Sequence, residues 1–500
     1  MVLVISPPSG SLSKKRRISD DSFATLPPPA PPTANHESGA GAARPLALVH
    51  RLPLELLFEI FTLAIDQPFN VFTGGPWTLG RVCRNWRRIA WSCPALWASF
   101  WVPRLSFSKE TVSIALLNGV LQRSGCADLT FAVDFDYLCG SHKLLVDCLL
   151  PHISRWKSAS FVHARPDAIV SSFSERAHPQ PFQLVSLSLG FAEPTYLDSV
   201  TDACNVFREA PRLRTLRLSV PHQIFWPRSI QLPWAQLTHL ILDLRKSGAV
   251  RKCIDTLALC PRIEVFEDQN TDADWSNVNT NIVTLPAIRS LRLRSSCILN
   301  YLTCPSLDDL TLPSNALNAQ TSTALEMMQL RSHFQVRKFC LIPSQDPRCR
   351  RPISVVIPIP VFSETTELII DLRYFKDWGN LSQLFQQIAF EGFPKLRSLT
   401  IKTPRVFTAE ESCIAFDSAL VDLIEYRWQA VEPRLRTVRI ESENVTREVS
   451  NTRSDWKDAV MYNIQRLTAF KQEGLDLKVY DLKGEQNFIM SMDAKTDSAG

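Results

Sequence analysis

Glycine is scarce in this sequence, with 16 residues in a chain of 500. Phosphate-cradling loops and dinucleotide-binding turns need glycines at fixed spacings, and neither pattern occurs. The Gly-x-Ser-x-Gly turn of α/β-hydrolases is also missing. A fold can assemble a Cys/His nucleophile from distant positions, but no residue pattern here indicates one. We therefore expect no catalytic residues and no intrinsic enzyme activity.

Closely spaced metal ligands are missing as well. The 13 cysteines include no Cys-x-x-Cys pair, and no two of the nine histidines lie four residues apart. An odd, scattered set of cysteines indicates neither a disulfide framework nor a zinc site. The composition therefore predicts a reducing compartment, no metal and no cofactor.

Long apolar runs are absent too. The first residues hold only a short apolar stretch before Pro7, too short for a signal-peptide core, and no later run approaches the length of about 18 that a membrane helix needs. The 55 Lys+Arg and 50 Asp+Glu residues leave a net charge of only +5. Apart from one short N-terminal cluster, the positive charges are also spread along the chain rather than concentrated in one region. We expect neither a membrane nor a nucleic acid as a partner.

Residues 1–45 are rich in Pro, Ser, Ala and Gly, a composition that buries too little apolar surface to offset the entropy of ordering. They predict a disordered tail, and the polar residues 484–500 predict a second one. The basic run Lys14–Arg17 has two interpretations, a nuclear import signal or a solvated patch. The predicted localisation is therefore nuclear, cytoplasmic or both.

Residues 46–101 carry helical patterns. Apolar residues recur at three- and four-residue steps after Pro53 and predict a helix that begins near that proline: Leu56, Leu57, Ile60 and Phe61. A second helix is predicted from Trp77 to Ala90, with Cys83 on its apolar face as a buried small hydrophobe. So much apolar surface in a short segment predicts that part of it contacts another protein.

Three motifs stand in order in this segment: Leu52-Pro53-x-Glu55-Leu56-Leu57-x-x-Ile60-Phe61, Val82-Cys83-Arg84-x-Trp86-Arg87, and Pro94-x-Leu96-Trp97. In order and spacing they resemble the F-box family, in the form common in mushroom-forming fungi. One departure is the stretch 66–76, which is longer than in compact family members.

The resemblance implies that residues 46–101 are a three-helix module that docks on the Skp-type adaptor of a cullin-RING ubiquitin ligase. The adaptor-binding residues that it implies are Leu52, Pro53, Glu55, Leu56, Leu57, Ile60, Phe61, Val82, Cys83, Trp86 and Trp97. The alternative is a small helical bundle that uses these side chains only for its own core.

Residues 102–483 repeat the pattern apolar-x-x-apolar-x-apolar. Clear copies begin at Leu184, Leu213, Leu237, Ile288, Leu307, Leu396 and Leu435, and weaker ones at Ile263, Val336 and Thr365. The intervals of about 19 to 39 residues bracket the length of a leucine-rich repeat. Helical spacing between several copies predicts alternating strands and helices, an α/β solenoid with a parallel sheet backed by helices. Helix and strand patterns at 109–135 and 456–479 predict its two caps.

If the apolar positions of each repeat point inward, their neighbours line the concave face of the sheet. The candidate target-binding residues on it are Arg217, Asp243, Arg292, Arg294, Lys402 and Arg439. The outward positions taken together are polar and mildly basic, which suits an acidic or phosphorylated peptide. The alternative is a solvated sheet face whose real contacts lie in loops.

Together these patterns predict the substrate-recognition subunit of an SCF-type (Skp–cullin–F-box) ubiquitin ligase. The module would bind the adaptor, and through it a cullin, while the repeats bind a protein target that the sequence does not identify. Two alternatives stay open: an interaction scaffold that recruits no ligase, and a hydrolase hidden in the repeats.

Overall fold

A computed structural model describes residues 52–65, 68–104, 110–135, 142–164, 172–173, 182–191, 207–220, 231–244, 249–269, 281–314, 318–343, 357, 359–372, 381–403, 417–430, 434–442, 454–481 and 486–487. The chain divides into two units, residues 1–53 and 54–500, and all the described helices and strands belong to the second. The predicted tail 1–45 and its basic run lie outside the described residues.

The second unit is built on one 16-stranded sheet, of which 15 strands run parallel. Its first half comprises β1 (Phe69–Asn70), β2 (Ser99–Val102), β3 (Leu129–Asp134), β4 (Trp156–Ala164), β5 (Ser186–Phe191), β6 (Thr215–Val220), β7 (His239–Leu244) and β8 (Val265–Asp268). Its second half comprises β10 (Ser290–Leu293), β12 (Asp309–Pro313), β13 (Lys338–Ile342), β14 (Glu367–Asp371), β15 (Ser398–Lys402), β16 (Thr437–Ser442), β17 (Asp476–Asp481) and the antiparallel β18 (Gln486–Asn487). Two short strands, β9 (Val283–Thr284) and β11 (Leu302–Thr303), pair separately. The strands follow one another in chain order, as in a solenoid.

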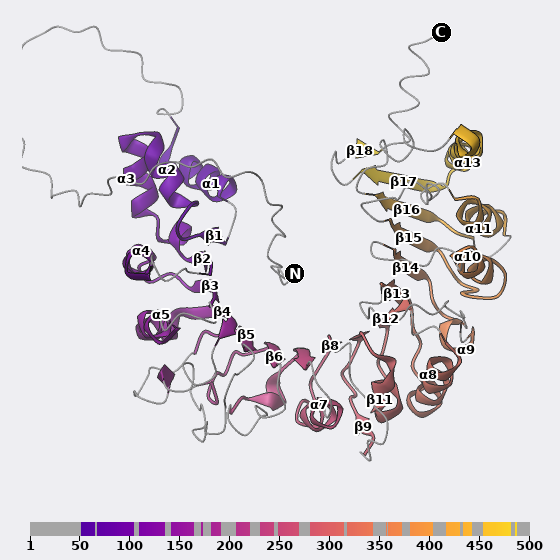
Figure 1. The fold of residues 1–500 in the computed structure, drawn as a ribbon, viewed down its shortest axis with the longest axis horizontal. Coiled ribbons are helices and arrows are strands. Elements are labelled where there is room, and N and C mark those ends of the chain that lie inside the picture. The colour runs from indigo at the N-terminus through magenta and orange to yellow at the C-terminus, as the bar shows by residue number, and fades with distance from the viewer. Residues whose placement is uncertain are drawn as a thin grey trace, which may run out of the picture. The chain divides into compact units, whose positions relative to one another are not determined.

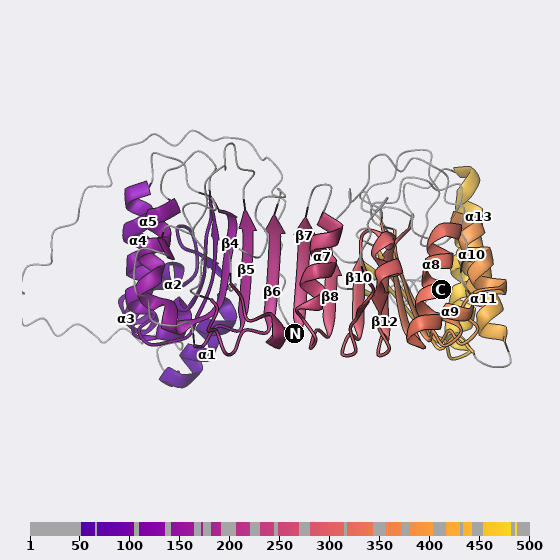
Figure 2. The same cartoon turned by 90° about the horizontal axis from the view of Figure 1, so that it is seen from below.

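Helices follow many of the strands and lie along one face of the sheet (Figures 1 and 2). The α-helices are α1 (Leu54–Ala64), α2 (Pro76–Val82), α3 (Arg84–Ser92), α4 (Glu110–Arg123), α5 (His142–Leu149), α7 (Ala249–Ala258), α8 (Ala319–Ser332), α9 (Ile359–Phe362), α10 (Leu381–Phe390), α11 (Ser418–Gln429) and α13 (Ser454–Gln472). Short 3₁₀ turns are η2 (Pro94–Trp97), η4 (Leu150–Arg155), η5 (Trp234–Gln236) and η6 (Ser296–Tyr301). The predicted α/β solenoid-like architecture, a parallel sheet with helices, is confirmed.

The core lies between the sheet and these helices. In each repeat the fourth residue of the pattern, such as Leu291, pairs in register with its counterparts on the neighbouring strands, and none of these side chains is more than 2% exposed from β2 to β17. The sixth residue forms a second buried row, because side chains alternate between faces along a strand. Asp268 interrupts that row between Leu242 and Leu293 and is fully buried.

Three arginines connect successive repeats on the helix-bearing side. Arg155 Nη2 donates to Ala127 O at 2.8 Å, and Arg331 Nη2 donates to Leu302 O at 3.2 Å. Arg427, which is buried, donates to carbonyl oxygens at the C-terminal end of α10. A cation is favoured there because the last carbonyls of a helix have no partner within it.

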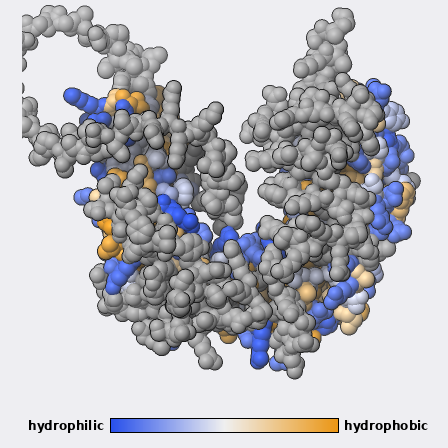
Figure 3. Space-filling view, in the orientation of Figure 1, coloured by the Kyte–Doolittle hydropathy of each residue, from blue (hydrophilic) through white to orange (hydrophobic). Residues whose placement is uncertain are grey.

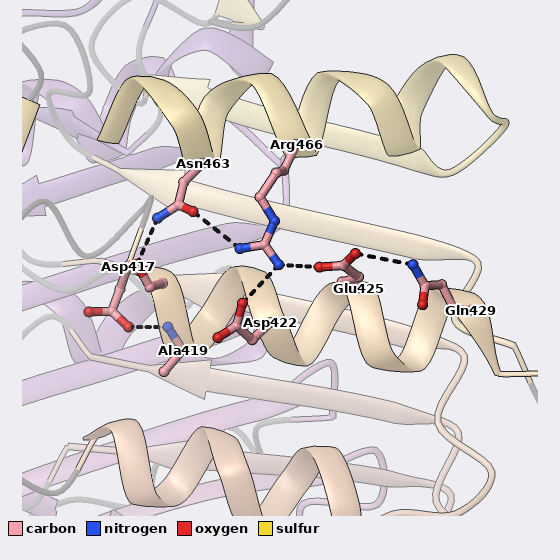
Figure 4. Close-up of polar contacts among 8 residues, drawn as sticks. Asp417, Ala419, Asp422, Glu425, Gln429, Asn463 and Arg466 are labelled. Atoms are coloured by element: carbon pink, nitrogen blue, oxygen red, sulfur yellow. Dashed lines mark hydrogen bonds and ion pairs between the residues drawn. The ribbon is translucent and has the colours of Figure 1, made fainter. Parts of the chain in front are cut away.

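The last two helices of the row, α11 and α13, are joined by polar contacts (Figure 4). Arg466 on α13 points between two acids of α11, donating to Asp422 Oδ1 at 2.8 Å and also to Glu425. Beside it, Asn463 donates to Ser418 Oγ at 3.0 Å. The stripe predicted from Trp456 is thus the final packed helix, α13, and β17 follows it as expected.

Some predicted boundaries differ from the structure. The predicted helix from Trp77 to Ala90 is two helices, because Cys83 between them is extended, with φ −158° and ψ 170°. Part of the predicted C-terminal tail, Gln486–Asn487, pairs with β17. The segment predicted as a purely helical module also contributes β1 and most of β2 to the sheet.

Candidate functional site

Helix α1 presents apolar side chains on two faces. Leu57, Phe61 and Ile65 point inward and are buried, with the Phe61 ring 4.8 Å from the Trp86 ring between centroids. Three residues on the opposite face are also apolar and exposed: Leu56 by 46%, Ile60 by 41% and Leu63 by 86%. Leu54 begins the helix on the side of Phe61, seven residues later, and is exposed by 47%. We call Leu56, Ile60 and Leu63 the outer stripe of α1.

The outer stripe belongs to a wider apolar surface. Val82 at the end of α2 and Trp91 on α3 are exposed by 59% and 44%. Six of the 16 large hydrophobic side chains that are exposed among the described residues therefore fall between positions 54 and 91. Hydrophobic residues reach the surface in this part of the molecule in Figure 3. The polar residues of α1, Glu55, Glu59 and Thr62, lie on another side of the helix. An exposed apolar surface of this kind is typical of an interaction site.

The structure divides the predicted adaptor-binding residues into three groups. Exposed are Pro53, Glu55, Leu56, Ile60 and Val82; half-buried are Leu52, Cys83 and Trp86; buried are Leu57, Phe61 and Trp97. The buried side chains serve the segment's own core, where Trp97 Nε1 donates to Ala90 O at 2.8 Å. The prediction did not include Leu54, Leu63 or Trp91, although Leu63 lies seven residues after Leu56 on the same helical face.

Cys83 is a cap rather than a buried hydrophobe. Its Sγ accepts a hydrogen bond from Trp86 N at 3.4 Å, which satisfies a free N–H in the first turn of α3. Arg87 Nε donates to Gly80 O at 2.8 Å and holds α2 against α3. The extended residue turns the chain, so α2 and α3 pack as a pair.

Arg123 at the end of α4 joins the segment 54–101 to the first repeat. Its guanidinium carbon lies 5.1 to 5.2 Å from the ring centroids of Trp77, Trp91 and Trp97. Stacking of a cation on indoles is attractive, and more so when water is partly excluded. Together with the pairing of β2 and β3, this contact fixes the apolar surface to the start of the repeats.

The sheet face opposite the helices, here called the open face, carries a balanced set of charges. This face is not mildly basic as predicted, because the outward positions of the strands also carry acids, among them Glu267, Glu367 and Asp476. Ion pairs on this face join Lys338 to Glu367 at 3.1 Å, Lys402 to Glu441 at 3.4 Å and Lys478 to Asp476 at 3.3 Å. These three lysines of the open face therefore already have an acidic partner.

The predicted target-binding residues fall into two groups on the open face. Arg217 donates to Gln269 Oε1 at 3.2 Å, Asp243 accepts from Ser219 Oγ at 2.9 Å, and Lys402 forms its ion pair. By contrast, the side chains of Arg292, Arg294 and Arg439 have no hydrogen bond or ion pair with any residue that the structure describes.

A cavity of about 300 Å³ opens on this face between β8 and β14. Arg292, Arg294 and Lys338 line it together with Glu267, Asp268 and Asp309. Burial raises the pKa of Asp309, an effect that the charges of Lys338 and Arg292 and a hydrogen bond from Ser290 partly offset. Burial also raises the pKa of the Cys340 thiol in the wall to about 11, so this thiol is protonated at neutral pH.

Metal ligands do not gather in the described ranges, where no group of three or more His, Cys, Asp or Glu side chains could hold a metal ion. Among the same residues, no helix is long and apolar enough to cross a membrane. No protein-family model matches the chain, and no curated protein matches its sequence.

Proposed function

We propose that this protein is the substrate-recognition subunit of an SCF-type ubiquitin ligase. In this proposal residues 46–101 act as an F-box module that binds a Skp-type adaptor, and the leucine-rich-repeat-like sheet binds the protein target. The observation that carries it is the outer stripe of α1, because this helix is packed on one face and still exposes a row of large apolar side chains on the other.

The sequence motifs support the same assignment. The Leu-Pro entry, the Val-Cys-Arg-x-Trp motif and the Pro-x-Leu-Trp motif occur in the order of the F-box family, and the outer stripe follows directly on the first of them. Val82 in the second motif is exposed beside Cys83, the cap of α3. The motifs thus supply both the core of the small segment and its exposed apolar surface.

The chemistry required of such a subunit is positional. Holding a target beside the enzyme that carries activated ubiquitin raises the effective concentration of its lysines, so the receptor needs no acid, base or nucleophile of its own. A rigid connection between the two binding surfaces favours this role. The indole cage around Arg123 and the continuous ladder from β2 onward provide that connection.

Direct adaptor binding tests the proposal. The double variant Leu56→Ala, Ile60→Ala removes two members of the outer stripe while keeping a good helix former at each position. Full burial of such a side chain contributes about 1.5 to 3 kcal/mol, and somewhat under half of each is still exposed. We expect adaptor binding, measured by calorimetry, to weaken about 10- to 100-fold.

A matched control lies on α8, where Met327 and Leu330 are exposed by 49% and 68%. The double variant Met327→Ala, Leu330→Ala should bind the adaptor like the wild type. If the wild type binds no Skp-type adaptor, the proposal fails and the protein is better described as an interaction scaffold. Equal losses in both double variants would assign the effect to general destabilisation rather than to the outer stripe.

A further inference from the structure

Two arginine side chains at the centre of the open face have free guanidinium donors among the described residues. Arg292 and Arg294 stand two residues apart on and just after β10, so both side chains point to the same face with a spacing of roughly 6.6 Å along the strand. Arg292 is exposed and Arg294 half-buried, and neither side chain has a hydrogen bond or ion pair with the described residues. Each guanidinium offers five N–H donors in a planar fork.

The acids around the cavity receive hydrogen bonds on some of their oxygens, whereas Asp309 Oδ1 is buried without a hydrogen-bond partner among the described residues. Glu267 Oε1 accepts from Gln269 Nε2 at 2.7 Å, and Asp309 Oδ2 accepts from Ser290 Oγ at 3.2 Å. The third cation of the lining, Lys338, is paired with Glu367 outside it. The N–H donors of the two arginines outnumber the unused carboxylate oxygens of the lining, so a complementary ligand brings mainly acceptors.

The size and walls of the cavity indicate how much of a ligand enters. Its volume of about 300 Å³ lies at the lower end of the range for ligand pockets, which suits one side chain rather than a cofactor. Leu293, Ile342 and Ile369 supply apolar wall on the same strands. Apolar walls beside two guanidiniums strengthen charge-assisted hydrogen bonds, because water is partly excluded.

We propose that this cavity is a recognition pocket for one oxyanion-bearing side chain of a peptide, a phosphoserine or a glutamate, held by bidentate hydrogen bonds from Arg292 and Arg294. The peptide backbone lies along the open face. The identification of this peptide as part of a ubiquitination target rests on the proposed function. In that case the oxyanion marks the segment of the target that is recognised. The pocket itself is tested without any adaptor.

The probes are three fluorescent peptide libraries of equal length, with random flanks and a central phosphoserine, glutamate or serine. Binding to the purified full chain is followed by fluorescence polarisation at low and high salt. We expect the phosphoserine or the glutamate library, or both, to bind at least tenfold more tightly than the serine library. The difference should shrink at high salt, because screening weakens contacts between exposed charges.

Variants of the two arginines show whether binding occurs in the pocket. Arg292→Gln with Arg294→Gln should abolish the preference over serine, since a hydrogen bond to a charged group corresponds to about tenfold or more in affinity. Arg292→Lys with Arg294→Lys should retain only part of it, because lysine keeps the charge but lacks the fork. Arg439→Gln is the matched control, an exposed arginine on β16 that also lacks a described partner but lies outside the cavity.

The outcomes separate the possibilities. A preference for phosphoserine alone identifies a phosphorylated target, and a preference for glutamate alone identifies an acidic one. If no library exceeds serine, or if Arg439→Gln reduces binding as much as the double glutamine variant, the pocket assignment is wrong. These peptide measurements contain no adaptor. A wild-type protein that does not bind a Skp-type adaptor would therefore contradict the proposed function without changing the result for the pocket.

Discussion

Two adjacent residues of α1, Ile60 and Phe61, test how the structure divides this helix between core and surface. Phe61 is fully buried against Trp86, whereas Ile60 is exposed by 41%. Deletion of a buried phenyl ring destabilises a protein by about 3 to 5 kcal/mol. Ile60→Ala should stay below about 1 kcal/mol, because substitutions at exposed sites have small effects.

The two variants should differ most in the local stability of α1 to α3. An isolated helix of 11 residues is marginal in water, so α1 depends on the packing of Phe61. Hydrogen–deuterium exchange with mass spectrometry resolves this segment from the repeats. We expect Phe61→Ala to accelerate amide exchange in α1 and α3 by about 10²- to 10³-fold, and Ile60→Ala to leave it within tenfold of the wild type.

The reverse result would refute the orientation of α1. If Ile60→Ala accelerated exchange as much as Phe61→Ala, the outer stripe would be part of the core and would not be available to a partner. Exchange in α10 and α11 serves as the internal control, because those helices lie in distant repeats and should respond to neither change.

Three further predictions concern the fold. Gly75→Ala should lower the melting temperature by destabilising the protein about 1 to 3 kcal/mol, because φ is +67° and a Cβ would lie 2.4 Å from Phe69 Cγ; an unchanged melting temperature would contradict the close approach. Arg427→Met should destabilise α10 and α11 by about 1.5 to 3 kcal/mol, measured by amide exchange, because buried carbonyl oxygens lose a charged donor; unchanged exchange would show that the contact is dispensable. Burial, and then the charge of Arg155, lower the pKa of His152 below its unfolded value of 6.5. The unfolded chain therefore binds more protons than the folded one, and the contribution of His152 to stability is lost as the pH falls below 6.5. His152→Gln should therefore reduce the drop in melting temperature between pH 7.5 and 5.5, and an identical drop would rule out this source.

The repeating part of the fold was predictable because its signal is local. Leu396, Leu399 and Ile401 carry in six residues the alternation of a strand, and the same spacing recurs in its neighbours, where the structure has strands in register. Even the weak copy at Val336 forms β13, since Phe339 and Leu341 suffice to continue the two buried rows. Asp268 shows that one apolar position of such a row can be lost without ending the sheet.

Features that depend on a single backbone angle or on distant pairing were not predictable in the same way. Apolar spacing from Trp77 to Ala90 fits one helix, and only the extended conformation of Cys83 divides it. The charge balance of the open face needs the register of strands some 30 residues apart, which brings Glu367 beside Lys338. For the same reason, the sequence indicated Arg292 and Arg294 as outward residues but did not predict that they line a cavity.

Recovery of a cullin with this protein from its native cell, with the proteasome blocked, tests the central claim most directly. We expect wild-type protein and the Met327→Ala, Leu330→Ala control both to recover the Skp-type adaptor and a cullin. The Leu56→Ala, Ile60→Ala variant, folded by circular dichroism, should recover much less of both. Wild-type protein that is folded and abundant but recovers neither adaptor nor cullin would contradict the assignment as a ligase subunit.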